Sequence, residues 1–144
     1  MTGPELQLAA VAWTVATVGS KTLVTSGWQS AQTVSRGSWV TVLDPEVSYT
    51  VTQLGRPGAT FEGRWTLHFL VGGADDNPTD SYKRCWTVID RLLLGLDDLT
   101  VRLQVDRSVM WAAPEAVSSE TVWSEEGRET VLRLELSVLT QGGF

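Results

Sequence analysis

The chain has 144 residues, a size that favours one domain with its own hydrophobic core. Its net charge of −6 and pI near 4.7 argue against a protein that holds nucleic acid on a basic face. Its single cysteine, Cys85, excludes an intrachain disulfide framework and a zinc site built from several cysteines. We therefore expect a single domain over residues 1–144. Because the first residues lack the basic region of a secretory signal, we expect synthesis in the cytoplasm.

Residues 4–18 are predicted to form the first helix. Pro4 suits an early helical position, and Gly19 suits the end of the helix. Apolar side chains surround this segment, so a helix here must be buried on more than one side, in its own domain or under a neighbouring subunit. A pair of strands is the alternative, because Val, Thr and Trp are plentiful. The segment is too short to span a bilayer.

Residues 19–45 carry only Lys21, Arg36 and Asp44 as charges. Short strands are predicted near 22–25 and 38–43, although the stretch would also serve as an arm that lies on a partner. The scarcity of charge is typical of an interface. A polar, uncharged loop explains it equally well.

A hairpin with a long tip is predicted next. Residues 47–52 alternate between apolar and polar side chains, as in a strand with one buried face. Residues 64–71 alternate in the same way, with Trp65, Leu67 and Phe69 on one face. The glycine-rich residues 55–63 connect the two strands.

The clearest helix of the chain is predicted at residues 81–96. Its apolar positions recur at steps of three and four: Tyr82, Cys85, Trp86, Ile89, Leu92, Leu93 and Leu96. Thr79 and Asp80 mark its start, because either side chain can accept a bond from the first free backbone amides. After Asp97 and Asp98 the pattern changes to strict alternation, which predicts a strand over 99–105.

Two further strands are predicted before the C-terminus. A modest strand covers 118–123, and a long one covers 130–140 with one wet face. Residues 141–144 are expected to be a loose tail. The predicted fold is therefore an α+β domain: an antiparallel or mixed four-stranded sheet with two helices packed on one face.

The sequence contains few groups suited to catalysis. His68, the only histidine, falls on the strand face opposite Trp65 and Leu67, where a surface residue is expected. The acid pairs of the chain all lie where turns are predicted, and they lack the ligand spacing of a calcium loop. We predict no catalytic residue, no cofactor-binding residue and no metal ligand, and therefore no enzyme.

Seven tryptophans are many for so small a domain, and because tryptophan is enriched at protein interfaces, they indicate an interaction surface. Trp28, Trp39, Trp111 and Trp123 are the ones that the predicted core absorbs least easily. An alternative of equal weight is that they cover the second face of the sheet. The predicted interface residues are Trp28, Trp39, Met110 and Trp111, of which Met110 and Trp111 are preferred because they fall in a linking segment.

The order of elements resembles the tail terminator proteins of long-tailed bacteriophages. It comprises a first helix, a poorly charged connection, a long-tipped hairpin, an amphipathic helix, a strand directly after it and a long final strand. The resemblance implies a structural virion protein of the tail neck, which forms a six-fold ring on the tail tube protein. Such a ring stops tube growth and presents a surface to the head–tail connector protein, and DNA passes through it without specific binding.

Other functions remain open on the same sequence. The chain would also suit another neck or tail component, such as a head–tail connector or a tail completion protein. From a different class, a ligand-binding module or small enzyme would use the open face of the sheet or residues 55–63 as a pocket wall. A plain interaction domain of a bacterial protein is the third alternative.

Overall fold

The structure is a computed structural model that describes residues 1–27, 37–54, 59–74, 78–124 and 127–143. Within these ranges the chain forms three helices and a six-stranded mixed sheet. The elements in chain order are α1 (Gly3–Val18), β1 (Thr22–Ser26), β2 (Gly37–Val42), β3 (Glu46–Leu54), β4 (Ala59–Ala74), α2 (Pro78–Leu94), α3 (Leu96–Leu103), β5 (Val109–Ser124) and β6 (Gly127–Gly143). The prediction of a four-stranded sheet with two helices is therefore wrong, and the fold is mixed α/β.

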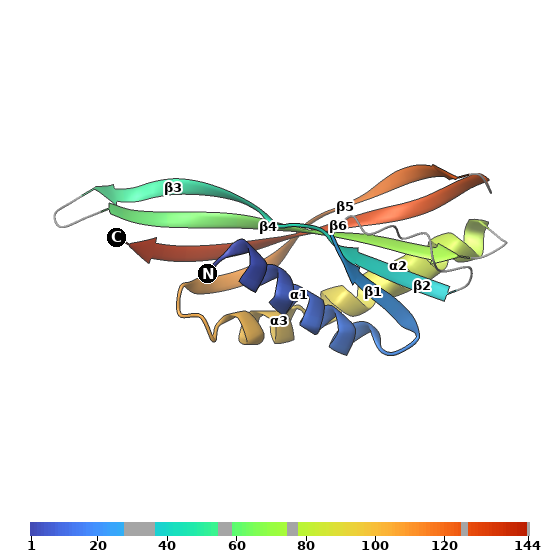
Figure 1. Cartoon of the computed structure of the whole chain (residues 1–144), viewed down its shortest axis with the longest axis horizontal. Helices are drawn as coiled ribbons and strands as arrows, with labels where there is room; N and C mark the ends of the chain where they lie inside the picture. Colours follow the sequence, from blue (N-terminus) through green and yellow to red (C-terminus); the bar gives the residue numbers. More distant parts are fainter. Residues whose placement is uncertain (28–36, 55–58, 75–77, 125–126, 144) are drawn as a thin grey trace.

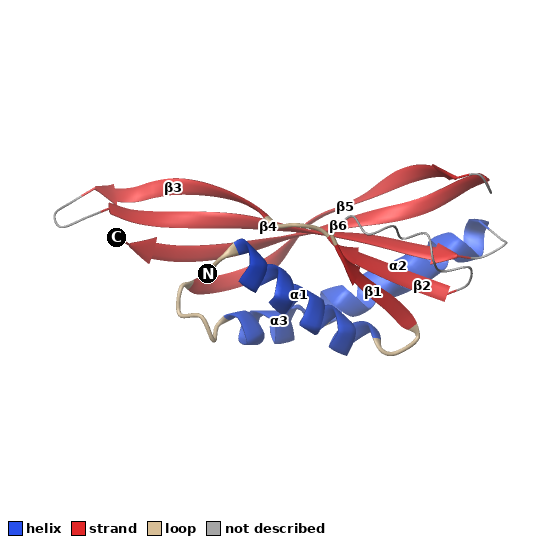
Figure 2. Cartoon of the chain, in the orientation of Figure 1, coloured by secondary structure: helices blue, strands red, loops and turns tan. Residues whose placement is uncertain are grey.

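The sheet has the strand order β1-β2-β4-β6-β5, and β3 pairs with the first half of β4. Only β1 and β2 run parallel among the described strands, and every other pairing is antiparallel. The sheet is strongly twisted, and all three described helices lie on one of its faces (Figures 1 and 2). We call this the helix face and the opposite side the open face. The sheet extends beyond the helix layer at both ends of the molecule (Figure 2).

Residues 96–103 form a helix, whereas a strand was predicted over 99–105. Leu99 and Leu103 are buried and one helical turn apart, whereas Val101 between them is exposed. Asp97 and Asp98 lie in the first turn, where carboxylates favour the helix dipole, and Asp98 accepts a 2.8 Å hydrogen bond from Arg102. Apolar residues at every second position fit a strand, but Leu99 and Leu103 alone also fit one side of a helix. Tertiary packing buries these two residues and leaves Val101 exposed.

Longer and additional strands account for the rest of the difference. The linking segment predicted at Met110 and Trp111 is the first part of β5, and β6 continues through 141–143, where a loose tail was expected. Both short strands predicted within 19–45 are present as β1 and β2. Pro114 is tolerated in β5 because this strand is at the edge of the sheet, next to a bulge.

The core lies between the helix layer and the helix face of the sheet. It is built from one face of α1 and α2 and from alternate residues of β4 and β6, and includes Leu6, Trp13, Cys85, Ile89, Leu92, Leu67, Phe69, Leu134 and Leu136. The helices predicted over 4–18 and 81–96 are thus confirmed as α1 and α2, although α2 ends at Leu94 and Tyr82 of its predicted apolar stripe is exposed. Thr2 and Glu5 form a capping box that fixes where α1 begins.

Trp13 joins α1 to the sheet and to the junction between α2 and α3. Its ring packs edge-to-face on Phe69 of β4, with centroids 5.9 Å apart. Its Nε1 donates a 2.9 Å hydrogen bond to the carbonyl of Gly95, between α2 and α3. A Cβ on Gly95 would lie 3.0 Å from Thr17, so glycine allows this junction to approach α1 closely. The inner face of α1 is therefore held in one orientation, and its other face points away from the domain.

Candidate interaction surfaces

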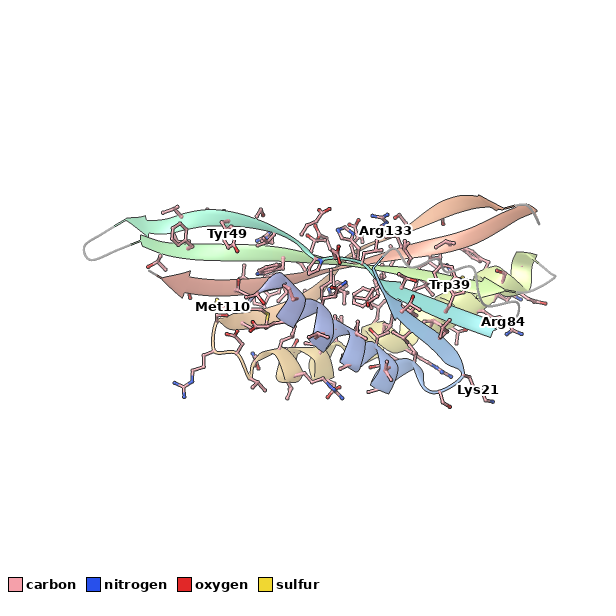
Figure 3. All side chains as sticks on the ribbon, in the orientation of Figure 1. Lys21, Trp39, Tyr49, Arg84, Met110 and Arg133 are labelled. Atoms are coloured by element: carbon pink, nitrogen blue, oxygen red, sulfur yellow. The ribbon has the colours of Figure 1, made fainter. Side chains whose placement is uncertain are left out.

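Trp39 of the predicted interface set lies on the open face of the sheet and is buried there, with 5 % of its surface exposed (Figure 3). It is the cross-strand partner of Gly72, and its ring lies directly over that residue. A Cβ on Gly72 would come within 2.1 Å of the Trp39 ring, so only glycine leaves room for it. Val131 of β6 is the next residue along the same row and is also buried. Trp39 thus covers the second face of the sheet within its own chain.

Met110 and Trp111 lie near the start of β5, at an edge of the sheet. A register shift occurs between Val109 and Trp111, so Met110 is the extra residue of a bulge. Trp111 pairs with Leu139 on the open face and keeps 38 % of its surface exposed. Both residues are therefore accessible in the single chain.

For Trp28 and Trp123, the structure does not show whether the side chain is buried or exposed. Trp28, the fourth residue of the predicted interface set, lies outside the described residues. Trp123 belongs to β5, and its side chain is outside the described part. Of the predicted set, the structure thus brings together only Met110 and Trp111.

His68 is buried on the open face, where an exposed side chain was expected. Its ring lies between two carboxylates from the neighbouring strands: Nε2 is 3.7 Å from Glu46 and Nδ1 is 3.5 Å from Glu135. Neither ring nitrogen has a hydrogen-bond partner among the described residues, so no serine or threonine there is paired with it as a nucleophile would be. The expectation was wrong because flanking side chains of β3 and β6 enclose the ring.

The carboxylates beside His68 do not form a metal centre with it. They approach opposite nitrogens of the ring, so they cannot converge on one ion bound to a single nitrogen. More widely, the described residues contain no group of three or more His, Cys, Asp or Glu placed to hold a metal ion. Glu46, His68 and Glu135 therefore form polar contacts that join β3, β4 and β6.

The outer face of α1 is apolar and exposed. It consists of Leu8, Ala12, Val15 and Ala16, which lie opposite the buried Leu6, Ala10 and Trp13. Leu8 has 72 % of its surface exposed. No charged residue occurs between Glu5 and Lys21, so this face of α1 carries no charged side chain that would have to stay solvated. An uncharged helix face of this kind is typical of a surface that another molecule covers.

A second apolar surface lies on the helix face beneath the arm formed by residues 46–54 and 59–66, which we call the β3–β4 arm. The arm extends past the N-terminus of α1, so no described helix covers it (Figure 1). Tyr49 projects from β3 with 64 % of its surface exposed, and Val51 is exposed on the same side (Figure 3). A hollow of about 460 Å³, the arm hollow, is lined by Met1, Tyr49, Phe61, Gly63, Trp65, Ser108, Thr140, Gln141 and Gly142.

A short polar turn borders the arm hollow. The Asp106 carboxylate accepts hydrogen bonds from the hydroxyl and the amide of Ser108, at 2.6 and 2.9 Å, and its other oxygen lies 3.2 Å from the Met1 amino group. These contacts, chiefly the hydroxyl of Ser108, lower the pKa of Asp106 to about 2. The turn therefore anchors the start of α1 to the start of β5 beside the hollow.

These two surfaces were predicted from the sequence only in part. The apolar circumference of residues 4–18 predicted burial on more than one side, and the structure buries only one side. Tyr49 and Val51 were assigned to a buried strand face, since alternation alone does not show where a covering layer ends. Leu8, Val15 and Tyr49 are thus the accessible residues that the sequence analysis missed.

Comparison with known proteins finds no family model and no curated protein that matches this chain. In the described part of the chain, no helix combines the length and the apolar character needed to cross a membrane.

Proposed function

We propose that this chain is a structural protein of a bacteriophage tail and forms the terminator ring that caps the tail tube. The observation that carries this proposal is the pair of exposed apolar surfaces, the α1 outer face and the arm hollow. A small domain that exposes two such surfaces gains stability when copies assemble and cover them. Repetition of one contact around an axis closes a ring, for which we propose six copies.

The order of elements supports the same proposal, with one change. The first helix, the long hairpin, the amphipathic helix and the long final strand are present in the order that suggested the tail terminator resemblance. The element after α2 is a helix where the resemblance has a strand. The proposal therefore rests on the exposed surfaces first and on the order of elements second.

The charge of the chain suits a ring through which DNA moves. A net charge of −6 on each copy disfavours lasting contact with phosphates, because a basic lumen would hold them. The proposed partners are further copies of this chain, the tail tube protein on one side of the ring and the head–tail connector protein on the other. Met110 and Trp111, accessible on the edge strand β5, are proposed as contact residues of the assembled ring.

Addition of the purified protein to growing tail tubes tests this function. We expect tubes to stop at shorter lengths as the protein concentration rises, with a ring visible at one end of each tube in negative-stain images. Tubes that grow to the same length with and without the protein, and that carry no ring, would rule out the terminator function.

Two alternative functions make different predictions. Another neck component, such as a connector or a completion protein, would bind finished tails or filled heads and leave tube growth unchanged. A ligand-binding module is favoured only by the arm hollow, whose volume falls within the range of small-molecule pockets. Trp65 lines that hollow, so a bound compound would change tryptophan fluorescence in the isolated chain.

A further inference from the structure

The α1 outer face and the arm hollow cannot meet within one chain. Leu6 and Trp13 on the inner side of α1 are fully buried, and Trp13 is hydrogen-bonded to Gly95. Rotation of α1 toward the hollow would therefore remove its inner side from the core. No described residue of the same chain covers Leu8 or Tyr49, and a second molecule can cover them.

The chemistry of both surfaces restricts that molecule. A lipid surface fits α1 poorly, because interfacial helices carry Lys or Arg beside their apolar face and α1 contains neither. A charged peptide would leave its charges unpaired on a stripe that offers none. What fits the arm hollow is an uncharged, apolar and convex surface, and the α1 outer face is such a surface.

The shapes also match. The helix layer ends at the base of the β3–β4 arm, so the helix face forms a step there (Figure 1). A covering helix has a diameter of about 10 Å, which is the thickness of the layer that the arm lacks. Leu8 and Val15 are nearly two turns apart on one side of α1, so two aliphatic side chains can enter one hollow. The hollow presents Tyr49, Phe61 and Trp65 to them.

We infer that the α1 outer face of one copy seats in the arm hollow of the next copy, in a head-to-tail contact. This inference rests on the proposed ring and identifies the surfaces that would join its subunits. Each copy then uses one surface as donor and one as acceptor, which is the arrangement that closes into a ring when the rotation between copies allows it. The second copy replaces the helix that the arm lacks.

Sedimentation velocity over a dilution series tests the contact with two variants and a control. Leu8→Glu places a charge on the α1 outer face, and Tyr49→Glu places one at the hollow; both positions are exposed, so the fold should be kept. Each should raise the concentration needed for self-association by about tenfold or more. The control is Thr50→Glu, which carries the same new charge on the opposite face of β3.

Mixing the two variants gives the decisive result. The Tyr49→Glu protein retains an intact α1 outer face, and the Leu8→Glu protein retains an intact hollow, so an equimolar mixture should form a one-to-one pair that neither forms alone. A mixture that contains only monomers overturns the contact, as does equal association of Leu8→Glu and wild type. A wild-type chain that stays monomeric at every concentration up to about 1 mM also overturns it.

Failure of this contact is distinguishable from failure of the proposed function. If Leu8→Glu caps tail tubes as well as the wild type does, the contact is wrong and the terminator function stands. If the variants pair as expected but the wild type does not cap tubes, the contact stands and the terminator function is wrong.

Discussion

The indole ring of Trp39 lies directly over the Cα of Gly72, its cross-strand partner on the open face of the sheet. This pairing buries a large aromatic side chain on the face that no described helix covers. It explains how a tryptophan that the sequence suggested for an interface is used within the chain. It also makes Gly72 a sensitive position.

Gly72→Ala should destabilise the domain by about 2–3 kcal/mol, because its Cβ would come within 2.1 Å of the Trp39 ring and the ring must move. Chemical denaturation followed by tryptophan fluorescence measures the change. Gly142→Ala is the control, since its Cβ would have nothing within 4 Å; it should change stability by less than about 0.5 kcal/mol. Equal stability of both variants would mean that Trp39 does not lie on Gly72.

Trp13→Phe should cost about 2–3 kcal/mol of stability. The smaller ring leaves a void beside Phe69 and removes the hydrogen bond to the Gly95 carbonyl. Trp86→Phe provides the matched comparison, because Trp86 is only partly buried on α2 and its loss should be about half as large. Urea unfolding curves measure both losses of stability, provided that the dependence of the unfolding free energy on urea concentration is the same for the variants and the wild type. Equal costs would contradict the central position of Trp13.

Ile89→Asp should prevent folding, because it places an unpaired charge at a fully buried position of α2. Circular dichroism and the loss of a cooperative thermal transition would show it. Asp90→Asn, at the exposed neighbouring position, should leave the transition in place. A folded Ile89→Asp protein would remove this side of α2 from the core.

Asp106→Asn should lower stability at neutral pH by about 1 kcal/mol, a value reduced for the partial exposure of the carboxylate. The pKa of Asp106 is about 2 in the folded protein, below its ordinary value of 3.8, so the stabilisation is present above pH 4. It is lost as the pH falls through about 2. The difference in stability between wild type and variant should therefore shrink from pH 4 to pH 2.

Urea unfolding at several pH values measures this difference, and Asp97→Asn provides the comparison, because Asp97 is an exposed acid in the first turn of α3. A wild-type advantage over Asp106→Asn that is constant from pH 7 to pH 2 would show that the contacts with Ser108 do not stabilise the charged carboxylate.

Trp111→Ala should leave a folded monomer that assembles poorly, since more than a third of the side chain is exposed on the edge strand β5. If Trp111 is an interface anchor, its truncation should cost about 2 kcal/mol or more of assembly free energy. Light scattering gives the assembly and circular dichroism gives the fold. Tyr82→Ala, an exposed aromatic residue on α2, is the control. If the Trp111→Ala monomer is instead unfolded, and the fraction that folds assembles as the wild type does, Trp111 belongs to the core.

The sequence by itself determined the elements whose patterns are long and of one period. The helices at 4–18 and 81–96, the hairpin of β3 and β4, and the final strand all followed from where apolar side chains recur. The start of α1 is also set locally, by the capping box of Thr2 and Glu5, although the sequence prediction marked that start with Pro4. These features depend on neighbours in the chain, so the sequence specifies them directly.

Only the tertiary structure decided which faces are covered. Residues 99–103 satisfy both a strand pattern and a helical stripe, and contact with α1 and β5 selects the helix. His68 is buried between neighbouring strands, with its ring beside Glu46 and Glu135, which are distant in sequence. Tyr49 has the alternation of a buried position, yet it is exposed because the helix layer ends before the arm. Burial depends on residues brought together from distant parts of the chain, and a pattern along the chain cannot show where they meet.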